Sequence, residues 1–333
     1  MAYRVAVAGV TGAVGQEFLS IIEQRQFPFA SLTVLASSRS AGKQIPFMGK
    51  VYTVEEMTKD SFKGIELALF SAGASRSREF APAAVAAGAV VVDNSSAYRM
   101  DPQVPLVIPE INPQKIKEHK GIIANPNCST IIGIVPVWPL HKLNPVKRMV
   151  VSTYQAASGA GQSAMIELEE QAREILAGKE PTCTVFPYQI AFNVFSHNSA
   201  LGPNGYNLEE TKMVQETRKI FDCPQIAITC TCIRIPVFRA HCESINLEFT
   251  GPITPEEVRD LLSTAPGVSV LDDREHNRFP MPIDATGKDD VFVGRIRQDE
   301  SIPENRGINL WVAGDQLRKG AALNAIQIAE KLL

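Results

Sequence analysis

Long apolar runs are missing from this sequence: none approaches the roughly 18 uncharged residues that a membrane-spanning helix needs. A targeting peptide is not indicated, because residues 1–4 lead directly into Val-Ala-Val-Ala at 5–8, which is typical of a buried strand. The 33 Lys and Arg residues are balanced by 36 Asp and Glu, for a formal net charge of −3, so no broad basic surface can hold a nucleic-acid backbone. We therefore expect a cytoplasmic protein with small-molecule partners, no nucleic acid and no membrane.

Cysteine pairs with redox or metal-ligand spacing are also missing. No two of the six cysteines form a C-x-x-C pair, and nothing in the sequence indicates secretion. We expect thiols rather than disulfides, and no structural zinc or other metal site. The six residues are Cys128, Cys183, Cys223, Cys230, Cys232 and Cys242.

The 333 residues are enough for about two domains. In the first third, short β-branched runs alternate with helical patterns, which predicts an α/β fold with a Rossmann-like, doubly wound parallel sheet and helices on both faces. The expected strands are 4–8, 32–37, 67–71, 89–93 and 121–124, with helices that include 15–24 and 77–87.

From about residue 146 the pattern changes to longer strands separated by helices, which predicts a second, α+β domain with a mixed sheet. The residues that follow a strand at 308–312, from 313 to 333, have the pattern of one alanine-rich helix. The other expected elements here are strands 148–155, 226–235 and 243–249 and helices 162–176 and 208–221.

The junction between the first strand and the first helix carries the glycine-rich loop Gly-Val-Thr-Gly-Ala-Val-Gly at 9–15. Glycines remove Cβ atoms and a helix N-terminus presents N–H groups, so a phosphate can approach such a loop. The spacing departs from the commoner G-x-G-x-x-G fingerprint, and glycines also make ordinary tight turns. The position of this loop at the first strand–helix junction favours a dinucleotide-binding loop over an ordinary turn.

The segment after the second strand indicates which dinucleotide binds. NAD-binding folds usually carry an acid there for the ribose hydroxyls, whereas this chain has Ser-Ser-Arg-Ser at 37–40. An arginine flanked by hydroxyls suits a 2′-phosphate, although a solvated loop arginine is the alternative. The predicted cofactor is NADP, and its predicted contacts in these two segments are Gly9, Thr11, Gly12, Ala13, Val14, Ser37, Arg39 and Ser40.

Cys128 lies in the turn Asn-Pro-Asn-Cys at 125–128, between the strand 121–124 and an apolar helix. The carboxyl end of a parallel strand is where open α/β sheets place ligands. A helix N-terminus lowers the pKa of a thiol from its reference of about 8.5 and favours the thiolate. We expect Pro136 to bend or interrupt this helix. The alternative is that a cysteine packs as a small buried apolar residue, and this is what we expect of the other five cysteines.

A thiolate beside a nicotinamide indicates one reaction class. An aldehyde adds to the sulfur as a thiohemiacetal, which gives hydride to NADP⁺ and becomes a thioester. Phosphate then releases the product as an acyl phosphate, and the cycle can run in reverse as a reduction.

Three segments together resemble the aspartate-semialdehyde dehydrogenase family, and the resemblance extends over essentially the whole chain. They are the turn that holds Cys128, the glycine loop, and the segment that begins with Arg-Ile-Pro-Val at 234–237 and extends to His241. The resemblance implies reduction of L-4-aspartyl phosphate with NADPH to aspartate semialdehyde and phosphate, on the route to lysine, threonine and methionine. It also implies a homodimer formed through the second domain.

Site roles follow from the same resemblance. His241 would be the general acid/base, Gln155 would orient the substrate, and Arg234 would bind its α-carboxylate. Gln316 would contact the cofactor, which would place the C-terminal helix on the first domain. The expected division is then an NADP-binding domain of 1–128 with 313–333 and a catalytic and dimerisation domain of 129–312. The remaining implied contacts are Arg99 and Lys212 for the phosphoryl group, Glu209 for the amine, Asn127 for the substrate, and Ser158 and Gly159 for the cofactor.

Several of these assignments have alternatives in the residues themselves. His241 shares strand parity with the apolar positions 245, 247 and 249 and should face inward, where it could also be an ordinary core histidine. His241 lies an odd number of residues after Arg234, so on one straight strand their side chains would point to opposite faces of the sheet. Pro236 interrupts that strand, which removes the objection. Glu209 and Lys212 could form a plain i,i+3 surface ion pair.

Two other functions compete. N-acetyl-glutamyl-phosphate reductase shares the general architecture and the thioester logic. A catalytically silent NADP-binding paralogue is the non-enzyme alternative, but such a protein should have lost the nucleophile, and Cys128 is present.

Overall fold

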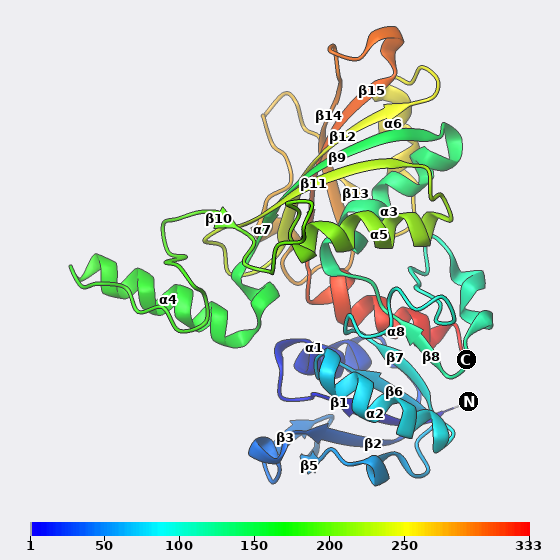
Figure 1. Cartoon of the computed structure of the whole chain (residues 1–333), viewed down its shortest axis with the longest axis vertical. Coiled ribbons are helices and arrows are strands. Elements are labelled where there is room, and N and C mark those ends of the chain that lie inside the picture. The colour runs from blue at the N-terminus through cyan, green and yellow to red at the C-terminus, as the bar shows by residue number, and fades with distance from the viewer. Residues whose placement is uncertain (1) are drawn as a thin grey trace. The chain divides into compact units, whose positions relative to one another are not determined.

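The computed structural model describes residues 2–333 and divides into two compact units, each of which is described by itself (Figure 1). The first unit contains the residues up to Asn127 together with Ala321–Leu333, and the second is Cys128–Gly320.

The first unit is built on a six-stranded sheet in the order β5-β2-β1-β6-β7-β8, in which every neighbouring pair is parallel. This is the predicted doubly wound α/β architecture. A separate antiparallel hairpin, β3–β4, was not predicted. The elements are β1 (Tyr3–Ala8), α1 (Ala13–Gln24), β2 (Phe29–Ala36), β3 (Gln44–Phe47), β4 (Lys50–Thr53), β5 (Glu55–Glu56), β6 (Leu67–Phe70), α2 (Ala74–Ala86), β7 (Val90–Asp93), β8 (Ile122–Ala124) and α8 (Leu323–Glu330).

Alternation along β1 divides the core of this unit between the two faces of the sheet, because successive side chains of a strand point to opposite faces. Val5 and Val7 pack in one apolar cluster with residues of α1 and α8. Ala6 and Ala8 pack in the other with residues of α2. A sheet buried on both faces is what a parallel sheet requires.

The second unit contains a seven-stranded mixed sheet in the order β10-β11-β9-β12-β15-β14-β13. Helices α3, α5 and α6 pack on one face of this sheet, and α3 lies along β9, β12, β14 and β15. The elements are α3 (Cys128–Leu143), β9 (Val146–Gln155), α4 (Gln162–Leu176), β10 (Phe195–Ser196), α5 (Leu208–Phe221), β11 (Ala227–Arg234), β12 (His241–Phe249), α6 (Pro255–Ser263), β13 (Val268–Val270), α7 (Pro282–Ala285), β14 (Val291–Gln298) and β15 (Gly307–Gly314).

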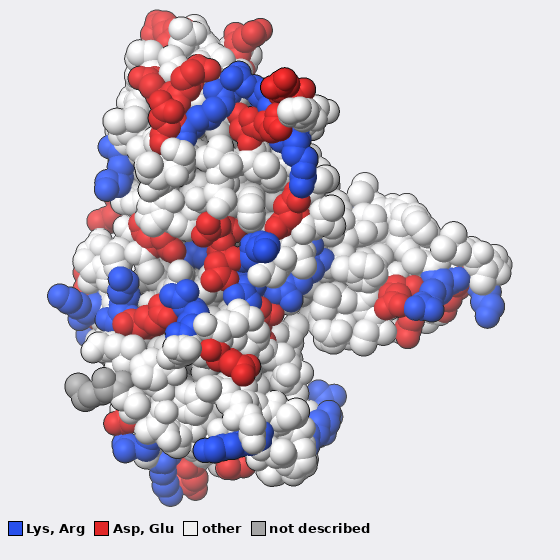
Figure 2. All heavy atoms as spheres, turned by 180° about the vertical axis from the view of Figure 1, so that it is seen from behind, with Lys and Arg blue, Asp and Glu red and all other residues white. Residues whose placement is uncertain are grey.

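An arm formed by α4 and the chain that follows it projects from this sheet (Figure 1). It has a small apolar cluster of its own around Leu168, Phe186 and Ile190. Seen from behind, most of its surface is uncharged, whereas elsewhere on that face Lys and Arg alternate with Asp and Glu (Figure 2). The exposed apolar side chains of the arm include Leu176, Tyr188, Phe192 and Val194.

The expectation of one helix at 313–333 is wrong, and the interruption that Pro136 could cause in another helix is absent. Residues 313–333 are not one helix: β15 continues to Gly314, a π-helical turn covers Arg318–Ala322, and only Leu323–Glu330 is α-helical. The second unit therefore keeps residues 313–320, as well as Cys128, and the chain returns to the first unit at Ala321. Helix α3 also runs without interruption through Pro136 and Pro139, because its almost complete burial holds the segment in helical form.

Within residues 2–333, no helix is both long and apolar enough to cross a membrane. The same residues contain no group of three or more His, Cys, Asp or Glu side chains that could hold a metal ion. All six cysteines, which are all described, are thiols without a disulfide.

Candidate active site

A cavity of about 410 Å³ lies where β1, β2 and β6 end. It is lined by residues that follow each of these strands, with Gly9 after β1, Ser37 after β2 and Ser71 after β6. The loops after β1 and β6 lead to helices on opposite faces of the sheet, so the cavity occupies the switch point at which such sheets bind nucleotides. Of the predicted cofactor contacts, the lining includes Gly9, Thr11, Gly12, Ser37, Arg39 and Ser40.

The glycines here are required by close backbone approach. Gly9 has φ +88°, and a Cβ at this position would lie 2.4 Å from the Ser71 carbonyl oxygen. A Cβ on Gly15 would lie 2.2 Å from the Gly9 carbonyl oxygen. Helix α1 starts directly after this turn, so its first N–H groups, which have no partner inside the helix, are available to a phosphate. The cradle fits a dinucleotide.

Ala13 and Val14 are not among the lining residues of this cavity. Val14 instead packs its side chain against the apolar core beneath α1. Its predicted contribution to cofactor binding is therefore limited to the backbone.

Three cations surround the same cavity. Arg39 belongs to the short 3₁₀ turn after β2, Lys43 follows that turn, and Arg76 lies in the first turn of α2. No acid is among the lining residues, so the site suits a nucleotide with an additional phosphate. Sequence reasoning found Arg39 but missed Lys43 and Arg76, which only the fold brings to it.

Cys128 is the first residue of α3 and is partly exposed, as a nucleophile must be. Its other side is closed by Gly320 in the π-helical turn, where a Cβ would lie 2.9 Å from the Cys128 Cβ. Cys128 is also close enough to Arg234 to interact with it electrostatically. Burial lowers the pKa of Arg234, and the interaction with Cys128 raises it. Cys128, the candidate nucleophile, is therefore packed closely against Gly320 and lies within electrostatic range of Arg234.

His241 is fully buried at the start of β12, as its strand parity predicted. Its Nδ1 accepts a hydrogen bond from the Ala156 backbone N–H at 3.0 Å. Nε2 has no hydrogen-bond partner among residues 2–333. Burial, followed by the charge of Arg234, lowers the pKa of His241 from 6.5 to about 3. The imidazole is therefore neutral at neutral pH, with its proton on Nε2.

Arg234 ends β11, and Pro236 separates it from β12, so the odd offset does not keep it away from His241. A Cβ built on Gly159 would lie 3.0 Å from Arg234 Nη1 and 3.1 Å from His241 Nε2. Both groups therefore point at one small volume that is open because residue 159 is glycine. Burial lowers the pKa of Arg234, and the neighbouring Glu209, Cys128 and Cys232 oppose this.

Ser158 and Gln316 hold the backbone around this volume. The Gln316 amide donates to the Ser158 hydroxyl, and its oxygen accepts from the Ala240 backbone N–H at 2.8 Å. Ala240 has φ +72°, a strained conformation for a residue with a Cβ, immediately before His241. Both Ser158 and Gln316 are buried, so in this unit they act as braces of the loop beside Gly159 and His241.

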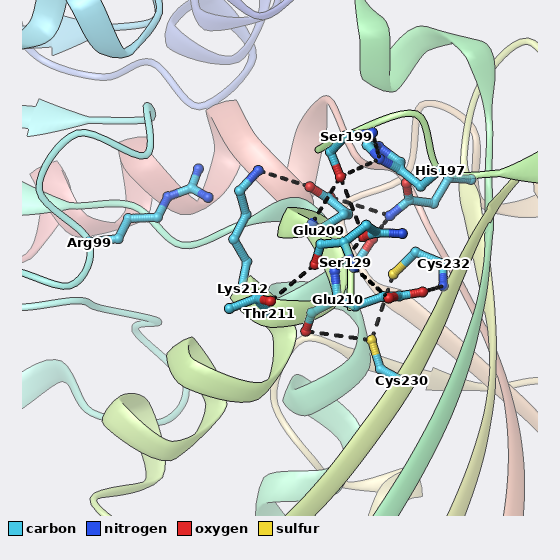
Figure 3. A network of polar contacts seen from close by, with 12 residues as sticks. Arg99, Ser129, His197, Ser199, Glu209, Glu210, Thr211, Lys212, Cys230 and Cys232 are labelled. Atoms are coloured by element: carbon cyan, nitrogen blue, oxygen red, sulfur yellow. Dashed lines mark hydrogen bonds and ion pairs between the residues drawn. The ribbon is translucent and has the colours of Figure 1, made fainter. Parts of the chain in front are cut away.

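Gln155, Glu209 and Lys212 form a connected set, of which Figure 3 labels Glu209 and Lys212. The Gln155 amide nitrogen lies 2.5 Å from the Ser129 hydroxyl and 3.4 Å from a Glu209 carboxylate oxygen. Lys212 Nζ lies 2.9 Å from the other Glu209 oxygen. The expected i,i+3 ion pair is present, but Glu209 is buried and contacts Gln155, so it is not a plain surface pair.

The first unit supplies Arg99 and Asn127, and both are buried. Arg99 donates to the backbone oxygens of Asn94 and Asn125, each at 2.9 Å, in the segments after β7 and β8. Asn125 in turn accepts from Asn324 of α8 at 2.7 Å. The C-terminal helix thus fixes the turn that precedes Cys128.

The described features are those of a dehydrogenase with a nucleotide-binding unit and a second unit that carries Cys128, the candidate nucleophile. Family models agree with this division: "Semialdehyde dehydrogenase, NAD binding domain" matches residues 4–119, and "Semialdehyde dehydrogenase, dimerisation domain" matches residues 137–319. The first unit is therefore an NAD(P)-binding domain.

Comparison with individual proteins narrows the class. An aspartate-semialdehyde dehydrogenase of Synechocystis is 56% identical over 330 residues, covering 99% of this chain and 97% of its own length. Aspartate semialdehyde dehydrogenase II of Vibrio cholerae, solved in complex with ASA, has a TM-score of 0.96 at 44% identity, covering 100% of this chain and 98% of its own. The enzyme of Candida albicans, solved with NADP, has a TM-score of 0.77 at 25% identity and covers 100% and 98%. The chain belongs to the aspartate-semialdehyde dehydrogenase family.

Proposed function

We propose that this enzyme reduces L-4-aspartyl phosphate to L-aspartate 4-semialdehyde and phosphate with NADPH, through a thioester on Cys128, in the synthesis of lysine, threonine and methionine. The observation that carries the proposal is the convergence of Arg234 and His241 on the volume left open by Gly159, in the unit whose first helix begins with Cys128. The choice of substrate rests on membership of the aspartate-semialdehyde dehydrogenase family.

The first chemical step is acyl transfer to sulfur. The Cys128 thiolate, at the N-terminus of α3, attacks the acyl carbon, and phosphate leaves with the electrons of the broken C–O bond. His241 presents Nε2–H, so it is suited to hydrogen-bond the oxyanion that develops on the substrate. This tautomer makes His241 a donor to substrate oxygen rather than the acceptor of the thiol proton.

The second step is reduction of the thioester. Bound NADPH would supply the hydride. The carbonyl oxygen again gains negative charge next to Nε2–H of His241, and collapse of the thiohemiacetal returns the Cys128 thiolate and releases the aldehyde. Arg234 would hold the substrate α-carboxylate, Glu209 its amine, and Lys212 and Arg99 the phosphoryl group, while Gln155 and Asn127 would orient the acyl group.

NADP is proposed over NAD because Arg39, Lys43 and Arg76 line the cofactor cavity. Arg39→Ala should raise KM for NADP⁺ by about tenfold to a hundredfold, the loss expected for a charge-assisted contact. The weaker use of NAD⁺ should be unchanged, and the exposed Lys63→Ala is the control. An equal loss with both cofactors would argue against a 2′-phosphate contact at Arg39.

The reaction is tested in its reverse direction with aspartate semialdehyde, phosphate and NADP⁺. We expect NADPH to form beyond one equivalent per active site only when phosphate is present, because phosphate must release the acyl group before the next turnover. Turnover of N-acetyl-glutamate semialdehyde without turnover of aspartate semialdehyde would replace the proposal by the reductase alternative. No turnover of either would favour the silent paralogue.

We also propose a cytoplasmic homodimer formed through the second unit. Its sheet carries α3, α5 and α6 on one face, while the other face presents the half-buried Tyr154, Phe292 and Trp311 around a small apolar cluster. Sedimentation should give twice the chain mass, and Tyr154→Glu should lower it. A monomeric wild type would contradict the dimer, and cell fractionation tests the location.

A further inference from the structure

His197 lies directly beside the arginine that the proposed function assigns to the substrate. β10 pairs with β11 so that Phe195 stands opposite Arg234, and the His197 backbone N–H donates to the Cys232 carbonyl at 2.8 Å. The ring nitrogen Nε2 is 2.8 Å from Arg234 Nη2. Because a guanidinium can only donate, Nε2 must be the acceptor.

This contact fixes the tautomer of His197. A neutral imidazole carries one proton, and with Nε2 accepting, the proton is on Nδ1. Nδ1 lies 3.1 Å from the Ser199 hydroxyl, to which it donates. The Ser199 backbone N–H also faces Nδ1, at 3.2 Å, but Arg234 leaves no other position for the proton. Burial, followed by the charge of Arg234, lowers the pKa of His197 to about 4, so the neutral form is the one present at neutral pH.

Ser199 extends the chain of hydrogen bonds to the start of α5 (Figure 3). Its hydroxyl accepts from the Glu209 backbone N–H at 3.1 Å and donates to the Asn207 side-chain oxygen at 3.3 Å. Asn207 is the N-cap of α5, and the same oxygen accepts from the Glu210 N–H at 3.0 Å. One hydroxyl therefore joins His197 to the helix turn that carries Glu209 and Lys212.

Arg234 has little else to fix its guanidinium. Nη1 donates to the Ala156 carbonyl at 3.3 Å, and the Phe186 ring lies 5.8 Å from the guanidinium carbon. Nε is buried without a partner among the described residues. An arginine side chain has several rotatable bonds, and one long hydrogen bond does not select a single orientation.

We propose that His197 and Ser199 are positioning residues: His197 fixes the plane of the Arg234 guanidinium, and Ser199 sets that plane relative to Glu209 and Lys212. The inference rests on the proposed function only in taking Arg234, Glu209 and Lys212 as substrate-binding groups. Sequence reasoning alone does not single out His197, because its significance depends on its pairing with a residue 37 positions away.

The test compares His197→Leu, which removes the acceptor, with His197→Gln, which restores one. His197→Leu should raise KM for aspartate semialdehyde by about tenfold to a hundredfold, the range for loss of a hydrogen bond to a charged group. It should change kcat and KM for NADP⁺ much less, and His197→Gln should recover most of the loss. The exposed His276→Leu serves as the matched control.

A double-mutant cycle separates positioning from general structural damage. In an Arg234→Lys background, His197→Leu should raise KM for aspartate semialdehyde by less than about twofold more, because the planar guanidinium that His197 orients is already absent. An unchanged KM in His197→Leu, or equal effects on substrate and NADP⁺, would overturn the inference. If His197→Leu does not fold, Ser199→Ala takes its place, with a rise in substrate KM expected and an unchanged KM overturning it. Failure of the wild type to use aspartate semialdehyde would instead overturn the proposed function.

Discussion

The Nδ1 atom of His241 accepts the Ala156 backbone N–H at 3.0 Å, and this contact determines what the histidine can do. An imidazolium would carry a proton on Nδ1 and oppose that N–H. Protonation is therefore disfavoured by the local geometry, in addition to burial and the charge of Arg234. In the proposed mechanism His241 therefore acts as a neutral hydrogen-bond donor.

Replacing His241 by Asn should lower kcat by about 10²–10³, the usual loss when one hydrogen-bond donor to a developing oxyanion is removed. The wild-type pH dependence of kcat/KM should show no acid limb at the ordinary histidine pKa, because the pKa of His241 is lowered to about 3. Wild-type activity in His241→Asn would remove the residue from the mechanism. An acid limb near 6.5 that disappears in this variant would contradict the neutral tautomer.

The same lowered pKa predicts how stability depends on pH. The folded state keeps His241 neutral down to about pH 3, while the unfolded state binds a proton below the ordinary pKa of 6.5. Stability is therefore full above 6.5 and falls as the pH decreases toward 3, by at most about 1.4 kcal/mol per pH unit for this group. Urea unfolding should show a smaller loss on acidification for His241→Asn, and an identical loss would contradict the assignment.

Gly159→Ala should separate catalysis from folding. The added Cβ would lie 3.0 Å from Arg234 Nη1 and 3.1 Å from His241 Nε2, in the volume proposed for the substrate. We expect kcat/KM to fall by about tenfold to a hundredfold, since small misplacements of catalytic groups have effects of this size. The thermal midpoint should change little, as for the exposed Ala160→Ser. Unchanged kinetics would show that the substrate does not occupy this volume.

Glu243 is a buried carboxyl whose two oxygens have no hydrogen-bond partner among residues 2–333. It faces α3 so closely that a Cβ on Gly133 would lie 2.4 Å from one oxygen. Burial, followed by the neighbouring Cys232, raises its pKa well above 4.5. The folded state therefore holds the protonated acid, while the unfolded state releases the proton above the ordinary pKa.

Stability depends on pH in the opposite direction for Glu243 and for His241. The stability contribution of Glu243 is present below pH 4.5 and is lost as the pH rises toward the raised pKa of its carboxyl. Glu243→Gln, which mimics the neutral acid, should be more stable than the wild type at about pH 8, with the difference shrinking toward about pH 5. Urea unfolding measures both, with Glu248→Gln on the same strand as the control. A destabilised Glu243→Gln at the higher pH would indicate an ionised, partnered carboxylate.

The sequence was most informative where the pattern was local. The bounds predicted for α4 and α5 are those of the structure, because both helices have continuous periodicity and α5 has an Asn207 capping box. The inward parity of His241 was also correct, because the register of β12 against β15 is regular from His241 to Glu248. The glycine loop was assigned to a nucleotide from its place between β1 and α1, and the cavity lies there.

The failures concern contacts between distant segments. Lys43 and Arg76 reach the cofactor cavity from a turn and from α2, and neither is part of a motif. The π-helical turn at 318–322 has helical composition, but Gly320 must pack against Cys128, which composition does not encode. Pro136 predicted a bend or an interruption, and the burial of α3 keeps the helix continuous through this residue.

The central claim, a thioester on Cys128, is tested most directly by trapping it. Enzyme mixed with aspartate semialdehyde and NADP⁺, without phosphate, should produce a burst of one NADPH per active site and an acyl adduct that mass spectrometry locates on the Cys128 peptide. The exposed Cys183→Ala should give the same burst and adduct, whereas Cys128→Ala should give neither. A burst that survives in Cys128→Ala, or an adduct on another cysteine, would contradict the covalent mechanism.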